Sequence, residues 1–249
     1  MQHFDDDKLA LPRGSLILVT GASGLIGSHV VHEALQAGYR VRGTSRSREK
    51  AELTSRVFYN HANYTTATVP AAQVDGAWDE VMVGVDAVIH LAADLSFNPD
   101  PHEVVTPTVD GVRNILRSAK RAGNVKRFVF TASITAALMP KANNRIVVSV
   151  DDWNQEAIEE AWKPPPYTPD RAFFTYGASK VAAEKALWSF MAEKQPGFTA
   201  NAILPGFNTG QILTSGGPTA PLVKTLLDGQ VPSVPPRMSS SPSRHGDFG

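Results

Sequence analysis

The sequence of 249 residues contains no cysteine, which excludes disulfide scaffolds, thiolate zinc sites and cysteine nucleophiles. It also has no excess charge of either sign, because 24 Lys and Arg balance 24 Asp and Glu. A neutral chain lacks the summed basic field that attracts nucleic acids and anionic membranes, so neither is an expected partner. The apolar runs are no longer than strands, and the acidic opening (MQHFDDDKLALPRG) has no apolar signal segment. These absences favour a soluble cytoplasmic protein.

Apolar residues make up 42% of the chain, enough to fill a core, and they alternate between strand and helix patterns. Residues 15–20 (SLILVT) form a continuous apolar run typical of a strand buried on both faces. Strands are also predicted at 39–44, 64–69, 85–91, 126–132 and 198–204, with helices at 25–37, 78–83, 103–121 and 172–193. Parallel strands need helix-sized crossovers, so we predict an α/β fold with a doubly wound parallel sheet and helices on both faces.

Composition divides the chain into three parts. Residues 15–236 are expected to form one domain, and residues 1–14 an N-terminal extension. Residues 237–249 continue a Ser/Pro-rich stretch with almost no apolar content, and we expect them to be disordered. The Pro-rich segment at 163–170 (KPPPYTPD) is interpreted as a surface loop, because helical patterning resumes directly after it.

A glycine-rich turn, TGASGLIG, follows the first strand and opens the first helix. Gly21 would permit the tight turn, Gly24 would let the backbone approach a pyrophosphate, and Gly27 would let the helix pack against the sheet. Unpaired amides at the helix start would then bind the phosphates of a dinucleotide. The alternative is a strand–helix turn whose glycines are incidental. Spacing and context together favour the dinucleotide site.

The end of the second strand distinguishes the two nicotinamide cofactors. Thr44 stands where a site for NAD usually carries an acidic residue, and basic residues surround it. An arginine fork suits a 2′-phosphate, so we predict NADP, with Arg46 as the main ligand and Lys50 or Arg42 as a helper. The alternative is a basic surface turn exposed to solvent.

Five tyrosines occur in the chain, and only Tyr176 is followed four residues later by a lysine, Lys180. Residues four apart share one face of a helix, so the phenol and the ammonium can point into one cleft. The ammonium would favour the phenolate and lower the pKa of the tyrosine. Such a tyrosine could donate a proton to an alkoxide that forms on a carbonyl. The motif alone also occurs by chance.

Ser133 comes just after the fifth predicted strand, at the edge of a parallel sheet where ligands bind. Its expected role is to donate a hydrogen bond to the substrate oxygen, with Thr131 as the fallback. A serine that only caps local backbone is the alternative. Asp151 and Asp152 could touch substrate, but we expect them, as the residues just before Trp153, to cap the start of a helix.

These motifs resemble the extended short-chain dehydrogenase/reductases, and within them the fungal NADPH-dependent aldehyde and ketone reductases of the methylglyoxal type and the plant dihydroflavonol reductases. The segments that carry the resemblance span most of residues 15–210 in the family's order. They are LVTGASGLIGSHVVHEALQAGYRVRGTSRS, GAWDEVMVGVDAVIHLAAD, VKRFVFTASITAALMPK, FFTYGASKVAAEKALWSFMAEK and FTANAILPGFNTG.

The resemblance implies a Rossmann domain, NADP as cofactor, no metal, and a catalytic triad of Ser133, Tyr176 and Lys180. His90 would run beside the nicotinamide ribose with the three residues after it, although a histidine that only ends a strand fits equally well. As in many relatives, a homodimer would use the helices at 103–121 and 172–193, and the oligomeric state stays open. The cofactor-binding residues that it implies are Gly21, Ser23, Gly24, Leu25, Ile26, Gly27, Arg46, Lys50, Leu91, Ala92, Ala93, Tyr176, Lys180 and Pro205.

Two departures from the family pattern bear on the site. The family usually carries an Asp near the adenine at the end of the third strand, where this chain has Val69, Pro70 and Ala71. Relatives also continue beyond this chain's length and form a small substrate lobe there. We therefore expect that lobe to be incomplete and the chain to be truncated at its C-terminus.

The function expected from residues and resemblance together is NADPH-dependent reduction of a small aldehyde or ketone to an alcohol. A truncated relative that still binds NADP but is catalytically impaired is the second hypothesis. A nucleotide-sugar epimerase or dehydratase, which shares the glycine turn and the Tyr–Lys pair, is the third and least favoured.

Overall fold

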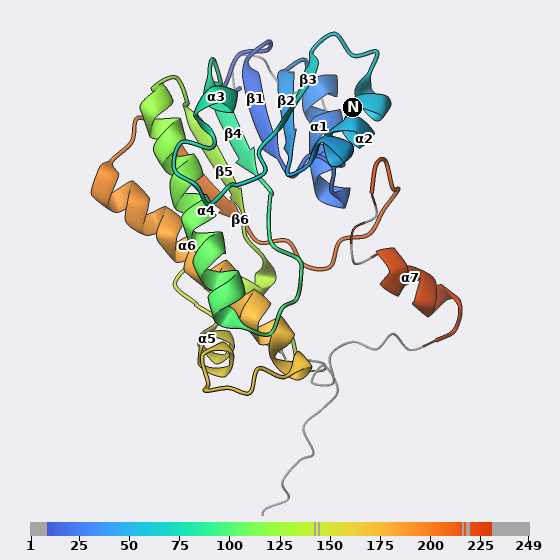
Figure 1. Ribbon diagram of the computed structural model, residues 1–249, viewed down its shortest axis with the longest axis vertical. Helices are drawn as coiled ribbons and strands as arrows, with labels where there is room; N and C mark the ends of the chain where they lie inside the picture. Colours follow the sequence, from blue (N-terminus) through green and yellow to red (C-terminus); the bar gives the residue numbers. More distant parts are fainter. Residues whose placement is uncertain (1–8, 142, 144, 216, 218–219, 231–249) are drawn as a thin grey trace, which may run out of the picture.

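The computed structural model describes residues 9–141, 143, 145–215, 217 and 220–230 (Figure 1). Within these residues, a parallel sheet of six strands has the order β3-β2-β1-β4-β5-β6, with the reversal of order at β1. Its strands are β1 (Leu16–Thr20), β2 (Arg40–Ser45), β3 (Tyr64–Thr68), β4 (Ala87–His90), β5 (Arg127–Thr131) and β6 (Thr199–Ile203). The predicted strands and the doubly wound parallel sheet are confirmed. The tail at 237–249 lies outside the described residues, as do residues 1–8 of the extension.

Four of the helices match the predicted ones to within a few residues. They are α1 (Leu25–Gln36), α3 (Asp79–Met82), α4 (Pro101–Ala122) and α6 (Ala172–Lys194). Two more were not predicted, α2 (Arg48–Phe58) and α7 (Ala220–Leu227), and α5 (Gln155–Ala161) was expected only through its capping residues. A short 3₁₀ helix, Ile134–Ala136, follows β5, and another, Pro169–Arg171, leads into α6. Figure 1 shows α4 and α6 side by side next to β4 and β5, with α1 and α2 beside β1, β2 and β3.

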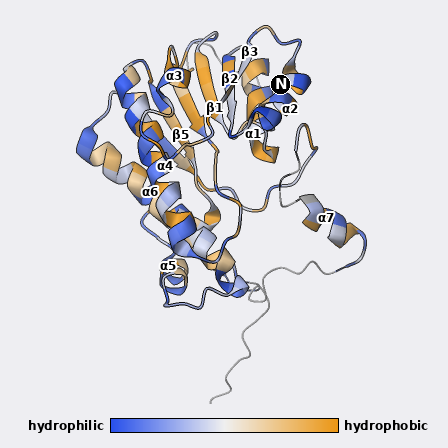
Figure 2. Cartoon of the chain, in the orientation of Figure 1, coloured by the Kyte–Doolittle hydropathy of each residue, from blue (hydrophilic) through white to orange (hydrophobic). Residues whose placement is uncertain are grey.

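The central strand β1 shows why the sheet is covered on both faces. Leu16 and Leu18 pack into the larger core cluster with residues of α4 and α6, whereas Ile17 and Val19 pack with α1 and β2. Successive side chains of a strand point to opposite faces, so a continuous apolar run is buried from both sides. Figure 2 shows the same pattern as hydrophobic strands between helices with hydrophilic outer faces.

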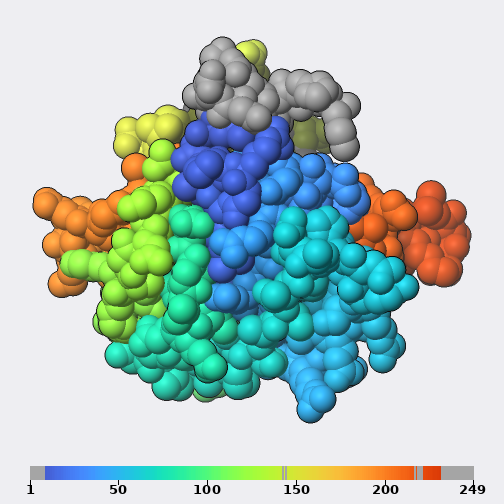
Figure 3. All heavy atoms as spheres, turned by 90° about the horizontal axis from the view of Figure 1, so that it is seen from above, coloured from blue at the N-terminus to red at the C-terminus, as the bar shows by residue number. Residues whose placement is uncertain are grey.

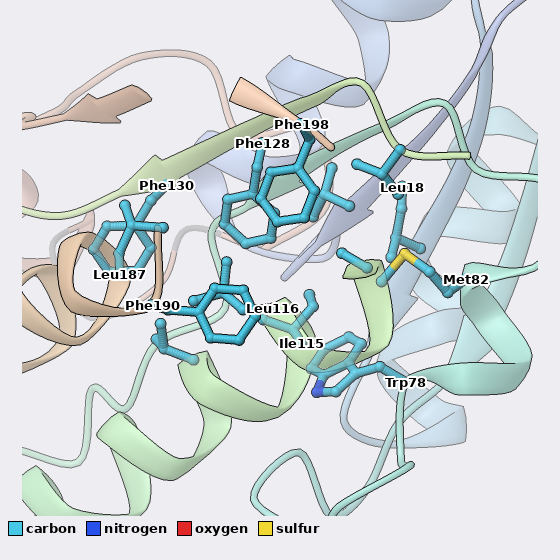
Figure 4. Packing of buried hydrophobic residues seen from close by; sticks show 14 of the residues in the cluster. Leu18, Trp78, Met82, Ile115, Leu116, Phe128, Phe130, Leu187, Phe190 and Phe198 are labelled. Atoms are coloured by element: carbon cyan, nitrogen blue, oxygen red, sulfur yellow. The ribbon is translucent and has the colours of Figure 1, made fainter. Parts of the chain in front are cut away.

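The larger cluster anchors the two long helices α4 and α6, and α6 carries Tyr176 and Lys180. The rings of Phe128 on β5 and Phe198 stack with centroids 5.8 Å apart, and Leu116 of α4 and Leu187 of α6 lie against this layer (Figure 4). Full burial of such side chains contributes about 1.5–3 kcal/mol each. The packing therefore fixes α6 against β5, and with it the spacing between the end of β5 and the first turns of α6.

The strands run toward the end of the molecule where α5 and α7 lie (Figure 1). Figure 3 views the opposite end, where the residues that lead into β1 occupy the middle of the surface. Their contacts there are made with the segment between α1 and β2: Gly14 donates to the carbonyl of Gly38, and the Tyr39 hydroxyl donates to that of Leu11. The carboxyl ends of the strands thus remain available for the site.

The start of α5 corrects one prediction. Asn154, rather than Asp151 or Asp152, caps the helix: its Oδ1 accepts a hydrogen bond from the amide of Ala157 at 2.9 Å. Asp152 instead accepts from the amide of Ser149 at 2.6 Å and closes the preceding turn. The two acidic residues precede the helix by too much to reach its first free amides.

Candidate active site

The glycine turn joins β1 to α1 in a conformation that requires glycine at two positions. Gly21 has a φ of +65°, in the left-handed region that strains other residues. A Cβ at Gly27 would lie 2.1 Å from the carbonyl oxygen of Gly21, so a side chain there would push the helix away from the turn. Gly24 is the N-cap of α1. The turn therefore brings the start of α1 directly over the end of β1.

The first turn of α1 presents backbone amides to this edge of the sheet. No side chain caps them, and the first hydrogen bond of the helix is donated by Ser28 to the carbonyl of Gly24. The amides of Leu25 and Ile26, like that of Gly27, therefore have no acceptor in the described part of the chain. Ser23 precedes them, and its carbonyl accepts from the Thr214 hydroxyl at 2.9 Å. Such free amides at a helix start bind phosphate groups.

Thr20 ties the end of β1 to the segment that follows β4. Its Oγ1 accepts from the amides of Leu91 and Ala92, both at 3.0 Å, and lies 2.9 Å from Nδ1 of His90. Both lone pairs of the hydroxyl are thereby used, so its one proton is donated to His90 Nδ1. His90 is consequently neutral, with its proton on Nε2. Ala93 continues this segment and is half-buried at the mouth of the site.

The end of β2 carries the residues predicted to select the cofactor. Arg46 and Lys50 are exposed at the junction of β2 and α2, and neither forms an ion pair with a described residue. Arg42 does not take part, because its guanidinium donates to the carbonyls of Val81 at 2.7 Å and Val83 at 2.9 Å. Its prediction as a helper is wrong, since those bonds hold it against α3. Lys50 is the helper that remains.

Ser133, Tyr176 and Lys180 meet between the end of β5 and the first turns of α6. Ser133 and Tyr176 lie close enough for the serine hydroxyl to lower the pKa of the phenol. The Lys180 Nζ lies over the Tyr176 ring, 5.7 Å from its centroid, and 3.4 Å from the carbonyl oxygen of Thr131. Thr131 thus contributes its backbone carbonyl, and Ser133 is the hydroxyl that contacts the phenol. Pro205 is held beside this group, because its carbonyl accepts from the amide of Ile134 at 2.9 Å.

Two phenylalanines cover the ring of Tyr176. Phe97, in the loop after β4 and with a φ of +51°, has its centroid 5.4 Å away, and Phe173 lies at 6.2 Å. This burial raises the pKa of Tyr176 above its ordinary value of 10.0, and the nearby Ser133 hydroxyl opposes the rise. The predicted lowering of the Tyr176 pKa by the ammonium of Lys180 is therefore corrected: burial raises this pKa, and the phenol stays protonated at neutral pH.

Burial lowers the pKa values of the two nearby bases, Lys180 and His90. Lys180 is 6% exposed, and desolvation lowers its pKa to about 8. His90 is 4% exposed, and burial together with the charge of Lys180 lowers its pKa to about 3. His90 is thus uncharged at neutral pH, whereas Lys180 is a buried ammonium that titrates just above it.

Two of these side chains were not singled out from the sequence. Thr20 had a signal, since it is a polar residue at the end of a strand that is otherwise apolar. Phe97 had none, because only the tertiary fold brings its loop to Tyr176. Val69, which stands where the family usually carries the Asp near the adenine, is buried just after β3, and its amide donates to the Ser45 carbonyl at 2.9 Å.

A groove of about 530 Å³ lies away from this site, between the C-terminal halves of α4 and α6. Its lining is mainly basic. The charged residues are Arg113, Arg117, Lys120, Arg121, Glu193 and Lys194. No described helix is long and apolar enough to span a membrane. The described residues also contain no cluster of three or more His, Asp or Glu that could bind a metal ion.

Comparison with known proteins decides the family. The model of the NAD dependent epimerase/dehydratase family matches residues 17–207, which include the glycine turn, Ser133, Tyr176 and Lys180. The chain belongs to this family. Its resemblance to the extended short-chain dehydrogenase/reductases is thereby confirmed.

Fungal proteins are among the similar sequences. The chain is 43% identical over 223 residues to the NAD-dependent epimerase/dehydratase terH of Aspergillus terreus, and covers 65% of that protein with 88% of its own length. It is 43% identical over 231 residues to aldehyde reductase 2 of Sporidiobolus salmonicolor, covering 67% of it with 90% of its own length. The chain thus spans about two thirds of the length of these relatives.

Solved structures of reductases share the fold. The Candida albicans Gre2 complex with NADPH superposes with a TM-score of 0.68 at 29% identity, over 78% of this chain and 58% of Gre2. The yeast methylglyoxal/isovaleraldehyde reductase Gre2, also complexed with NADPH, gives a TM-score of 0.66 at 30% identity, over 77% of this chain and 58% of the other.

Proposed function

We propose that this chain reduces an aldehyde or a ketone to an alcohol with NADPH. The observation that carries the proposal is the proximity of Ser133, Tyr176 and Lys180 between the end of β5 and the first turns of α6, at the carboxyl edge of the sheet. The relatives support it, because an aldehyde reductase and a methylglyoxal/isovaleraldehyde reductase are among them. The same edge is where ligands bind in doubly wound folds.

The residues present fit a dinucleotide phosphate. The uncapped start of α1 offers free amides to a pyrophosphate, and Arg46 with Lys50 offers cations to a 2′-phosphate. Ser45, at the end of β2, has a buried hydroxyl with no hydrogen-bond partner among the described residues, where a ribose would bind. Leu91 to Ala93 and Pro205 would line the nicotinamide side. When bound, NADPH supplies the hydride.

The three catalytic residues then have separate roles. Ser133 donates a hydrogen bond to the carbonyl oxygen and orients it toward Tyr176. Tyr176 donates its phenolic proton to that oxygen as the alcohol forms, and its raised pKa keeps this proton in place at neutral pH. Lys180, as an ammonium over the ring, stabilises the phenolate that remains. Tyr176 is half-buried, so water can return the proton to it.

Turnover with a panel of carbonyls tests the proposal. The chain is mixed with NADPH and with aldehydes and ketones of increasing size, and the absorbance of NADPH is followed. We expect NADPH to be consumed only when a carbonyl is present, with one alcohol formed for each NADPH. Binding of NADPH without reduction of any carbonyl would favour the impaired relative instead. Conversion of a nucleotide sugar without net loss of NADPH would favour the epimerase.

Arg46→Ala tests the cofactor assignment. A charge-assisted bond from arginine to a phosphate contributes about 1.5–3 kcal/mol, so we expect the Kd for NADPH to rise roughly tenfold or more and that for NADH to stay the same. Fluorescence titration of both cofactors gives the two values. Arg48→Ala is the matched control, because Arg48 is 91% exposed and pairs with Glu52 on α2. An unchanged preference in Arg46→Ala would remove this residue from the site.

The homodimer and the cytoplasmic location stay predictions. The helices expected to form the dimer are α4 and α6, and the basic groove lies between them. Across a two-fold axis, this groove would bring like charges close together. Such repulsion is screened by salt, so a dimer through this surface would form more readily at high ionic strength.

A further inference from the structure

The hydroxyl oxygen of Ser133 accepts two hydrogen bonds from one neighbour, Thr135. The Ser133 Oγ accepts from the Thr135 amide at 3.2 Å and from the Thr135 hydroxyl at 3.0 Å. Both residues are buried, at 8% and 3% exposure. The Thr135 hydroxyl has no other partner among the described residues, so its proton is donated to Ser133.

This arrangement fixes the direction of the Ser133 proton. A hydroxyl oxygen has two lone pairs and one proton. With both lone pairs accepting from Thr135, Ser133 can act toward other groups only as a donor. Its proton is therefore turned away from Thr135, and the phenol of Tyr176 is near enough to be affected by it, because the serine hydroxyl lowers the pKa of Tyr176.

Asn154 holds Thr135 in place. Its side-chain Nδ2 donates to the Thr135 carbonyl at 2.7 Å, and its backbone N–H donates to the carbonyl of Ala136 at 2.9 Å. Asn154 is 3% exposed and also caps α5, so α5 and the 3₁₀ turn after β5 form one unit. This unit packs directly on α6 beside Tyr176, since a Cβ at Gly177 would lie 2.9 Å from the Ala157 side chain.

We propose that Thr135 is a positioning residue for carbonyl reduction: its two hydrogen bonds occupy the acceptor sites of Ser133 and direct the serine proton to the substrate oxygen. The inference rests on the proposed function. Without the Thr135 hydroxyl, Ser133 regains a free lone pair, and its hydroxyl proton can point in several directions. The fraction of Ser133 oriented for donation then falls, and substrate binding through other contacts does not change.

Kinetics of Thr135→Val and Thr135→Ser test the proposal. Valine keeps the shape of threonine and removes the hydroxyl, whereas serine keeps the hydroxyl. We expect Thr135→Val to lower kcat about tenfold, equivalent to about 1.4 kcal/mol, with little change in KM, and Thr135→Ser to retain most of the activity. Thermal unfolding and NADPH titration check that each variant is folded. If Thr135→Val does not fold, Thr135→Ala removes the same hydroxyl without adding bulk.

A double-mutant cycle separates positioning from a structural effect. If Thr135 acts through Ser133, Thr135→Val causes no further loss of kcat in a Ser133→Ala background. A repeated tenfold loss in that background, or full activity of Thr135→Val alone, would overturn the proposal while the wild-type chain still reduces carbonyls. Inactivity of the wild-type chain with every carbonyl would instead refute the proposed function, and this inference with it.

Discussion

Tyr176→Phe lowers kcat for carbonyl reduction by about 10²–10⁴-fold, the usual contribution of a positioned general acid. The variant removes the one phenolic hydroxyl that meets Ser133 and leaves the ring that packs between Phe97 and Phe173. The fold and the Kd for NADPH should therefore stay close to those of the wild-type chain. Steady-state kinetics at saturating NADPH, together with a titration of the cofactor, measures both.

The matched control for this variant is Tyr59→Phe. Tyr59 is 77% exposed at the end of α2 and away from the site, so its hydroxyl should be dispensable. Reduction that persists at the wild-type rate in Tyr176→Phe would show that another group donates the proton. A loss of NADPH binding in the same variant would indicate a cofactor contact in place of acid catalysis.

Lys180→Met abolishes activity and, at pH 7, makes the protein more stable. Lys180 is buried, and among the described residues its one hydrogen-bond partner is the Thr131 carbonyl at 3.4 Å. Desolvation lowers its pKa from 10.5 to about 8, and each pKa unit corresponds to about 1.4 kcal/mol. Removal of this buried charge should raise the free energy of unfolding by on the order of 1–3 kcal/mol. Chemical denaturation at pH 7 measures the gain.

The gain should depend on pH in a defined direction. The folded-state pKa of Lys180 lies below its unfolded value, so the unfolded chain binds more protons between pH 8 and pH 10.5. The cost of the buried ammonium is complete below pH 8 and decreases as the pH rises through this window. The advantage of Lys180→Met should therefore shrink toward pH 10. Lys185→Met, at an exposed position on the same helix, should show no such trend. A less stable Lys180→Met at pH 7 would contradict this reading.

The features that could be predicted from the sequence are those with strong local patterns. The run of residues 15–20 is apolar throughout, and β1 is buried on both faces. The strand–glycine–helix pattern placed the turn, and the rule that ligands bind at the carboxyl ends of parallel strands brought Ser133 and Tyr176 together. Helix α2 was missed because its buried side is narrow, with only Ala51, Thr54 and Phe58 facing the core.

What could not be predicted depends on contacts between distant segments. The pKa of Tyr176 is raised because its ring is buried, in part by Phe97. Phe97 lies in the loop after β4, far from α6 in the sequence. Arg42 and Arg46 are both arginines near the end of β2, so the sequence does not distinguish them. Only the fold shows that the Arg42 guanidinium donates to carbonyls in and just after α3. Local pattern therefore predicts the residues of the candidate site, and tertiary packing sets the chemistry of those residues.

Isotope transfer tests the central claim most directly. The chain is incubated with an aldehyde and with NADPH that carries deuterium at the transferable position of the nicotinamide, and the alcohol is analysed by mass spectrometry. We predict an alcohol with one deuterium on the former carbonyl carbon, formed by the wild-type chain and far more slowly by Tyr176→Phe. An alcohol without deuterium, or no alcohol from a chain that binds NADPH, would contradict carbonyl reduction at this site.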